Sequence, residues 1–495
     1  MSSRGEKPNF ENGVVYRIVQ GIGAGIIGQF LGVAQRLLLP PLFLKAWGVG
    51  MYGDWLLVSA MVSHLALAEF GGTVYVINRL TQLYARRDEK EFGNTLQTSL
   101  GLFTALPAVI IFFFISALYL APDAWLYKFQ FLNFKTYRLI ISVLALQIFL
   151  SIPQALILGI YRALGKLPRG AMIANCMMFI QLILVGLGLN IQLGQIEIAL
   201  LQMVPIGATL IWAMYDLNLR WPELNMFSRW RIDLSLAKGI LVPSSHFFLI
   251  QFSMALSIQG TVIVAGLLMG ATHVVIFSTM RTLANSIKSI LGVISHAAWP
   301  DLTRLDAEAD FTRLNILFRS ILRTNICATV LFGYILMEFG DWIYQIWLGN
   351  LGLFDSSLMT LVIIFLTLQI SSGVYSNLLM ATNRHQPLSI LTIISSGVSI
   401  LLAYFGALHN GLDGMLHGLI LAELLPTVAI PYLAYRSFCF IKPSKAVLDM
   451  LPLAIIPILY YKPLTAVFLL PALAWWWWSV VGRFLTLKFK DQKGH

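Results

Sequence analysis

The sequence predicts an all-α polytopic membrane protein with about fourteen transmembrane helices, and three observations support that fold class. Hydrophobic residues make up 58% of the 495 residues and charged residues only 12%. The mean hydropathy is +0.77. Apolar runs of roughly 17–25 residues recur along the chain, each ending in charged or turn-forming residues. This composition excludes a string of soluble domains.

The candidate spans follow one another with short polar connections. They centre near residues 29, 66, 107, 150, 179, 207, 252, 286, 328, 367, 398, 424, 455 and 474. The thirteenth span, Val447–Tyr461, is short and contains two prolines, so the last pair is either two full spans or a tilted or re-entrant hairpin. Residues 1–16 are polar and lack a signal-peptide pattern, and we expect them to be retained.

Positively charged residues predict the orientation of these spans. With the N-terminus inside, 26 of the 34 Lys and Arg residues lie in inside segments, five in outside segments and three within spans. Both termini are therefore expected in the cytoplasm. Because the basic residues are spread between apolar blocks, the net charge of +11 reflects topology, and we expect no nucleic-acid partner.

The chain also repeats itself at a period of a little over two hundred residues. Leu80–Ala85 (LTQLYA) follows the second span, and Leu302–Ala307 (LTRLDA) follows the eighth. Six spans per unit is an even number, which predicts two parallel lobes related by an axis along the membrane normal. The expected domains are a cytoplasmic N-terminus (1–16), an N-lobe (17–219), a cytoplasmic linker (220–238), a C-lobe (239–436), a C-terminal hairpin (437–486) and a cytoplasmic tail (487–495).

Cations inside the spans are the main functional signal. The segment His273–Pro300 carries Arg281 and Lys288, seven residues apart and hence on one helix face, with Asn285 between them. Arg36 lies late in the first span. Charge at membrane depth is costly and usually faces a cavity, a partner or a substrate path. We therefore expect these four residues to line an anion-binding cavity.

Structural explanations for the same cations stay open. Glu69 and Glu423 are candidate ion-pair partners for the pair in the eighth span, and Arg36 is near enough to the outer end of its span to reach the interface. Glu69, His64 and Gln29 are themselves candidates for ion coupling or for lining the cavity. For Glu69 the alternative is a carboxylate that only packs between helices.

Other motifs have structural interpretations. Gly23–Gly28 matches G-x-G-x-x-G, but no strand precedes it, so these glycines are interpreted as close-packing or bending positions of the first helix. The three cysteines show no paired spacing and are expected to be packing residues. His246 and His296 are expected to be structural, and Trp475–Trp478 to be an interfacial belt. We predict no catalytic residue, metal or cofactor.

The run Gly48–Thr81 resembles the second-helix region of bacterial polysaccharide flippases of the multidrug/oligosaccharidyl-lipid/polysaccharide exporter superfamily. The likeness lies in Gly-x-x-x-Tyr-Gly-x-Trp before the helix, acidic-Phe-Gly near its end and Asn-x-Leu-Thr after it. The resemblance implies alternating-access transport of an undecaprenyl-pyrophosphate-linked oligosaccharide, such as an O-antigen or capsule unit, across the bacterial inner membrane. It also implies that Arg36, Arg281 and Lys288 line the central cavity.

Two rival functions remain. A cation-coupled multidrug exporter of the same superfamily would favour acidic rather than basic cavity residues. A membrane glycosyltransferase or polysaccharide polymerase would be expected to present catalytic acids in a sizeable outer loop, and the predicted outer loops are short. As partners we expect the lipid-linked oligosaccharide, membrane lipids and other polysaccharide-assembly proteins, with the chain acting as a monomer.

Overall fold

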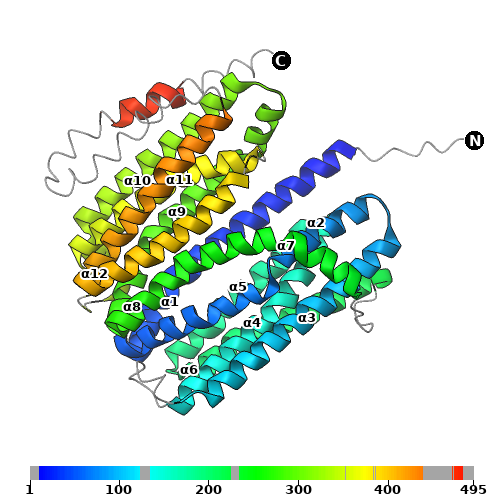
Figure 1. The fold of residues 1–495 in the computed structure, drawn as a ribbon, viewed down its shortest axis with the longest axis horizontal. Coiled ribbons are helices and arrows are strands. Elements are labelled where there is room, and N and C mark those ends of the chain that lie inside the picture. The colour runs from blue at the N-terminus through cyan, green and yellow to red at the C-terminus, as the bar shows by residue number, and fades with distance from the viewer. Residues whose placement is uncertain are drawn as a thin grey trace, which may run out of the picture. The chain divides into compact units, whose positions relative to one another are not determined.

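A computed structural model of the chain describes residues 10–122, 134–224, 233–349, 351, 353–382, 384, 386–438, 471 and 473–482. Within these ranges the regular elements are all helices (Figure 1). Nine helical stretches in the described ranges are long and apolar enough to cross a membrane. The predicted class of an all-α polytopic membrane protein is confirmed.

The chain divides into two compact units, Met1–Phe252 (unit 1) and Ser253–His495 (unit 2). Unit 1 contains α1 (Phe10–Ser63), η1 (His64–Glu69), α2 (Gly72–Ala85), α3 (Glu89–Leu120), α4 (Phe134–Ala163), α5 (Leu167–Asn190), α6 (Gln195–Arg220), η3 (Pro222–Leu224) and most of α7 (Leu234–Ala255). Unit 2 contains η4 (Leu256–Gly260), α8 (Thr261–Met269), α9 (Ala271–Ala307), α10 (Phe311–Leu348), α11 (Ser356–Ala381), α12 (Gln386–Ser437) and a helix over 473–482.

The core of unit 1 is built around α4, which packs against α1, α2, α3, α5 and α6. Leu156, Ile157 and Tyr161 of α4 are fully buried. They belong to one hydrophobic cluster with Leu80 of α2 and Phe103 of α3. The opposite face of α4 is also apolar, and Leu139 and Leu146 on it are each 43% exposed. A helix of a membrane protein is apolar on such a face because that face meets lipid, so α4 shows no single apolar stripe.

In unit 2 the corresponding central helix is α11, which packs against α9, α10 and α12 (Figure 1). Tyr375 and Leu378 of α11 are 1% and 0% exposed. In each unit, then, the fourth expected span packs against at least three other helices.

Local geometry repeats between the units with a constant offset of 222 residues. Gly48 in α1 has φ +73° and ψ 177°, and Gly270, between α8 and α9, has φ +87° and ψ 179°. Asp88 caps α3 by accepting a hydrogen bond from the Glu91 backbone N–H, and Asp310 caps α10 in the same way from Arg313. The LTQLYA and LTRLDA segments share this offset. Turns and caps therefore recur together with the sequence motif.

The second expected span is not one continuous α-helix. It is interrupted by the 3₁₀ turn η1, after which Phe70 and Gly71 adopt left-handed conformations before α2 begins. Gly72 then sits so close to Phe103 that an added Cβ would lie 2.0 Å from the ring. The seventh expected span is also interrupted, by the π turn η4.

The glycines of the first helix and the run Trp475–Trp478 agree with their predicted roles only in part. Of the small residues in the first helix, Gly28 does pack closely, because an added Cβ would lie 2.7 Å from Asn175 Oδ1, whereas Gly25 faces open space. Trp475 and Trp478 are exposed, but Trp476 and Trp477 contact α10 through Arg323 and Thr324. Most of the expected hairpin over 437–486, and the side chains of His246 and His296, lie outside the described residues.

Candidate functional site

The candidate site is the basic face of α9 in unit 2. Arg281, Asn285 and Lys288 follow one another at steps of four and three residues in an uninterrupted helix, which places them on one face. Arg281 and Asn285 are half-buried, and Lys288 is exposed. The structure thus brings three of the four predicted substrate-binding residues together.

Arg281 is anchored by the π turn that precedes α8. Its Nη1 donates to the carbonyl oxygen of Ile258 and to Oγ1 of Thr261, both at 2.9 Å. Its guanidinium also lies 4.9 Å from the centroid of the Phe277 ring. A π turn shifts the helical hydrogen-bond pattern, and such turns are common at functional sites. Because these acceptors are neutral, Arg281 forms no ion pair with any described carboxylate.

Lys288 reaches a carboxylate only through an amide. Its Nζ donates to Oε1 of Gln369 in α11 at 2.9 Å, and the Gln369 side chain also hydrogen-bonds the Glu423 carboxylate of α12. Ser372 Oγ donates to Glu423 Oε1 at 3.3 Å, and Glu423 is 9% exposed. Glu423 is therefore held between two neutral donors, and it attracts Lys288 without a direct ion pair.

The remaining predicted residues belong to unit 1. Arg36 and Gln29 of α1 are exposed side chains. His64 Nδ1 lies 3.0 Å from the carbonyl oxygen of Ala60, one turn earlier in the same helical stretch. Glu69 accepts hydrogen bonds from Thr73 and, at 3.2 Å, from Gln251 Nε2. Glu69 thus has two neutral donors in its own unit, and its pairing with the cations of the eighth span stays a prediction.

Several neutral partners of the predicted residues, in one unit or the other, were missed in the sequence. Arg281 donates to Thr261, Lys288 donates to Gln369, and Gln251 donates to Glu69. Only charged residues within spans were considered in the sequence, so these neutral partners were not singled out. The Gln369–Ser372 segment, a polar patch in an apolar span, is a signal that could have identified part of this network. Among the described residues no group of three His, Cys, Asp or Glu side chains is placed to hold a metal ion.

Comparison with known proteins identifies the fold. No protein-family model matches the chain, and no curated protein matches it either. An inward-facing multidrug resistance MATE family transporter of the MOP superfamily matches 84% of this chain and 95% of its own, with a TM-score of 0.64 and 15% identity. An outward-facing structure of such a transporter matches 85% and 95%, with a TM-score of 0.58 and 16% identity. A MATE in complex with MaL6 matches 85% and 95%, with a TM-score of 0.60 and 16% identity. The chain has the fold of these structures.

Proposed function

We propose that this protein is a membrane transporter that moves a polyprenyl-pyrophosphate-linked oligosaccharide from the inner to the outer leaflet of a bacterial cytoplasmic membrane. The fold shared with the MATE transporters supports transport by alternating access. The resemblance of Gly48–Thr81 to polysaccharide flippases supports the substrate class. In this proposal both termini are cytoplasmic and the substrate enters from the cytoplasmic side.

The observation that carries the substrate assignment is the unpaired charge of Arg281 on the α9 face. A cation held at membrane depth by neutral acceptors is costly unless it meets an anion at some stage of the functional cycle. Lys288, two turns away, adds a second positive charge on that face. Two such charges complement a pyrophosphate better than they complement a cationic drug.

The two side chains keep hydrogen-bond donors free for an anion. A guanidinium has five N–H donors and an ammonium three. Arg281 makes its hydrogen bonds through Nη1, and Lys288 makes one hydrogen bond, to Gln369. Among the described residues, Nε and Nη2 of Arg281 and the other N–H groups of Lys288 are therefore available to donate to an anion. Charge-assisted bonds from these groups would offset the cost of bringing a pyrophosphate into the spans while its polyprenyl tail stays in lipid.

The test is translocation of a labelled lipid-linked oligosaccharide in proteoliposomes. Loss of one charge-assisted contact should slow translocation about tenfold to a hundredfold in Arg281→Ala and in Lys288→Ala. Arg281→Lys should retain more activity because the charge remains. Lys238→Ala, which removes an exposed cation of α7, is the matched control and should transport normally. Normal translocation by both alanine variants, at normal expression, would contradict the proposed cation role.

A cation-coupled multidrug exporter is the second candidate, because the structural neighbours are described as multidrug resistance transporters. Glu423 and Glu69, carboxylates within spans, suit a cationic substrate or coupling ion. The same proteoliposomes distinguish the two functions. Export of a cationic dye that is lost in Glu423→Gln but kept in Arg281→Ala would favour the drug exporter.

A further inference from the structure

Unit 1 carries an apolar groove that plays no part in the proposed α9 site. A cavity of about 1090 Å³ opens between α1, α5 and α6. On α5 its lining runs along one face from Pro168 to Leu184, which at 1.5 Å per residue is about 24 Å of helix. One leaflet of a bilayer has roughly 15 Å of hydrocarbon. The groove is therefore long enough to hold a lipid chain along the membrane normal.

The rims of the groove are apolar and open to the surroundings. Met172, Ile180 and Trp212 line the groove and are 43%, 49% and 47% exposed. Cys176, expected from the sequence to be a packing residue, is also exposed along it. In a bilayer such a surface contacts lipid tails.

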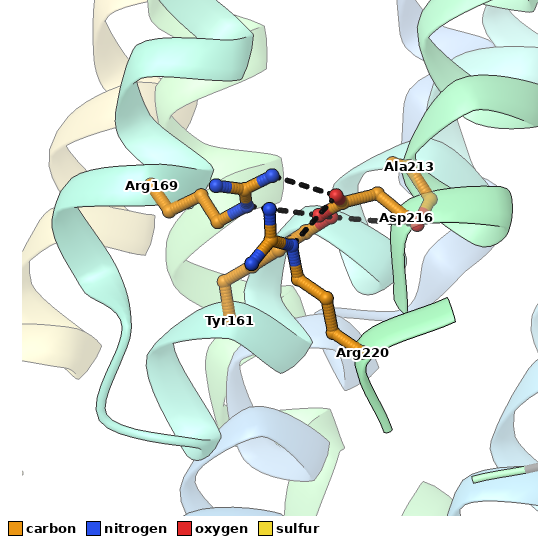
Figure 2. A network of polar contacts seen from close by, with 5 residues as sticks. All are labelled: Tyr161, Arg169, Ala213, Asp216 and Arg220. Atoms are coloured by element: carbon orange, nitrogen blue, oxygen red, sulfur yellow. Dashed lines mark hydrogen bonds and ion pairs between the residues drawn. The ribbon is translucent and has the colours of Figure 1, made fainter. Parts of the chain in front are cut away.

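The groove is basic at one end, where α4 and α6 end and α5 begins. Arg169 lines the cavity and donates to both oxygens of Asp216, from Nε at 2.9 Å and from Nη2 at 2.6 Å (Figure 2). Arg220 Nε donates to Asp216 Oδ1 at 3.0 Å, and the Tyr161 hydroxyl donates to Oδ2 at 2.7 Å. Two guanidinium groups thus share one carboxylate, which leaves one net positive charge.

The exposed part of this cluster is positive. The side chains of Arg169 and Arg220 are 35% and 50% exposed, whereas that of Asp216 is 7% exposed. Lys166, in the preceding turn, is exposed as well, and the N-terminus of α5 has no side-chain cap, so its partial positive charge adds to the cluster. An anion that approaches the end of the groove meets cations first.

We propose that this groove binds one anionic phospholipid of the bilayer, with an acyl chain along α5 and the phosphate at Arg169 and Arg220. Basic pockets between helices near a membrane face favour anionic headgroups, and the apolar groove supplies the chain site. This inference is independent of the proposed substrate, because it uses no residue of the α9 face.

A bound lipid would also connect α1 to α5. Gly23, Ala24 and Ile27 of α1 form one wall of the groove. In the same region Asn175 Nδ2 of α5 donates to the Ala24 carbonyl oxygen at 2.8 Å. A chain in the groove would fill the space between these helices, so anionic lipid should stabilise unit 1 as well as bind to it.

Cys176 provides a direct probe of occupancy in the full-length protein. With Cys327 and Cys439 replaced by serine, maleimide labelling of Cys176 reports access to the groove in neutral detergent. Added phosphatidylglycerol should slow labelling several-fold at concentrations where phosphatidylcholine has little effect. Equal protection by the two lipids, or no protection by either, would overturn the proposal.

Variants separate the headgroup from the chain. Arg220→Gln leaves Asp216 paired with Arg169 and should raise the half-protecting phosphatidylglycerol concentration about tenfold. Arg162→Gln removes an exposed cation from the last turn of α4 that is not bonded to Asp216, and it should leave the half-protecting concentration unchanged. Met172→Trp, which fills the groove without changing charge, should abolish lipid-specific protection. Protection by glycerol 3-phosphate as strong as by the lipid would show a free phosphate site instead and would contradict a lipid site.

Discussion

Asp216 joins three helices of unit 1 through one carboxylate. Its donors are Tyr161 at the end of α4, Arg169 at the start of α5 and Arg220 at the end of α6 (Figure 2). Asp216→Asn should lower the free energy of unfolding by about 1–3 kcal/mol, a value reduced from that of a fully buried pair because both arginines are partly exposed. Thermal unfolding of the purified protein measures the loss. Asp341→Asn, which removes an exposed carboxylate bonded to Gln345, should be nearly neutral, and an equal loss in both variants would contradict this role.

Single residues were predictable where their chemistry conflicts with the membrane. Arg281 and Lys288 are conspicuous because a charge inside an apolar run is rare, and the helical period alone places them on one face. Their partners were not predictable, because Thr261 and Gln369 come from other helices and only the tertiary structure brings them close. Asp216 was overlooked because it lies near a helix end, where a charged residue is ordinary.

At the scale of elements, α12 depends on glycines where its two arms meet. The helix turns at Asn410 and Gly411, which adopt non-helical conformations. An added Cβ at Gly418 would lie 2.2 Å from the carbonyl oxygen of Leu402. Gly418→Ala must therefore separate the backbones and should destabilise the protein by about 1–3 kcal/mol or more. Thermal unfolding and the yield of monodisperse protein report this loss.

The matched control lies in the same helix. Gly397 has open space around its Cβ position, so Gly397→Ala should be neutral or stabilising by up to about 1 kcal/mol through helix propensity. Normal stability of Gly418→Ala would show that the arms separate freely.

The positions of the helices along the chain were predicted from the sequence better than the breaks within them. Apolar run length sets where a span lies, and the described helices occur at the expected places along the chain. The 3₁₀ turn η1 and the π turn η4 were not predicted, because hydropathy is the same for a regular and an interrupted helix. Both interruptions lie beside candidate site residues, Glu69 at the end of η1 and the Arg281 acceptor Ile258 within η4.

At the scale of the whole molecule, the sequence repeat is matched by repeated backbone geometry. Gly48 and Gly270 share an extended-ψ, positive-φ conformation, and Asp88 and Asp310 share a helix cap. Positive φ in the left-handed half of the map favours glycine, which explains why a glycine stands at both breaks. The turn and the cap are separated by the same number of residues in both units, although η1 interrupts the segment in unit 1 and α9 is continuous in unit 2. With the six spans per repeat that the sequence predicts, we expect equivalent turns to face the same side of the membrane.

Topology can be tested at three exposed residues at or next to the connections between expected spans. Glu89 and Glu308 follow the second and eighth expected spans, and Gln192 follows the fifth. In a chain lacking its three native cysteines, Glu89→Cys and Glu308→Cys should react with a membrane-impermeant maleimide only in inside-out vesicles. Gln192→Cys should react only in intact spheroplasts, because an odd number of predicted spans separates it from the N-terminus, which we expect to be cytoplasmic. Labelling of Glu89→Cys and Glu308→Cys from opposite faces would contradict a parallel repeat. If all three variants were labelled from the face opposite to the expected one, the parallel repeat would stand, but the orientation predicted from the cation distribution would be wrong.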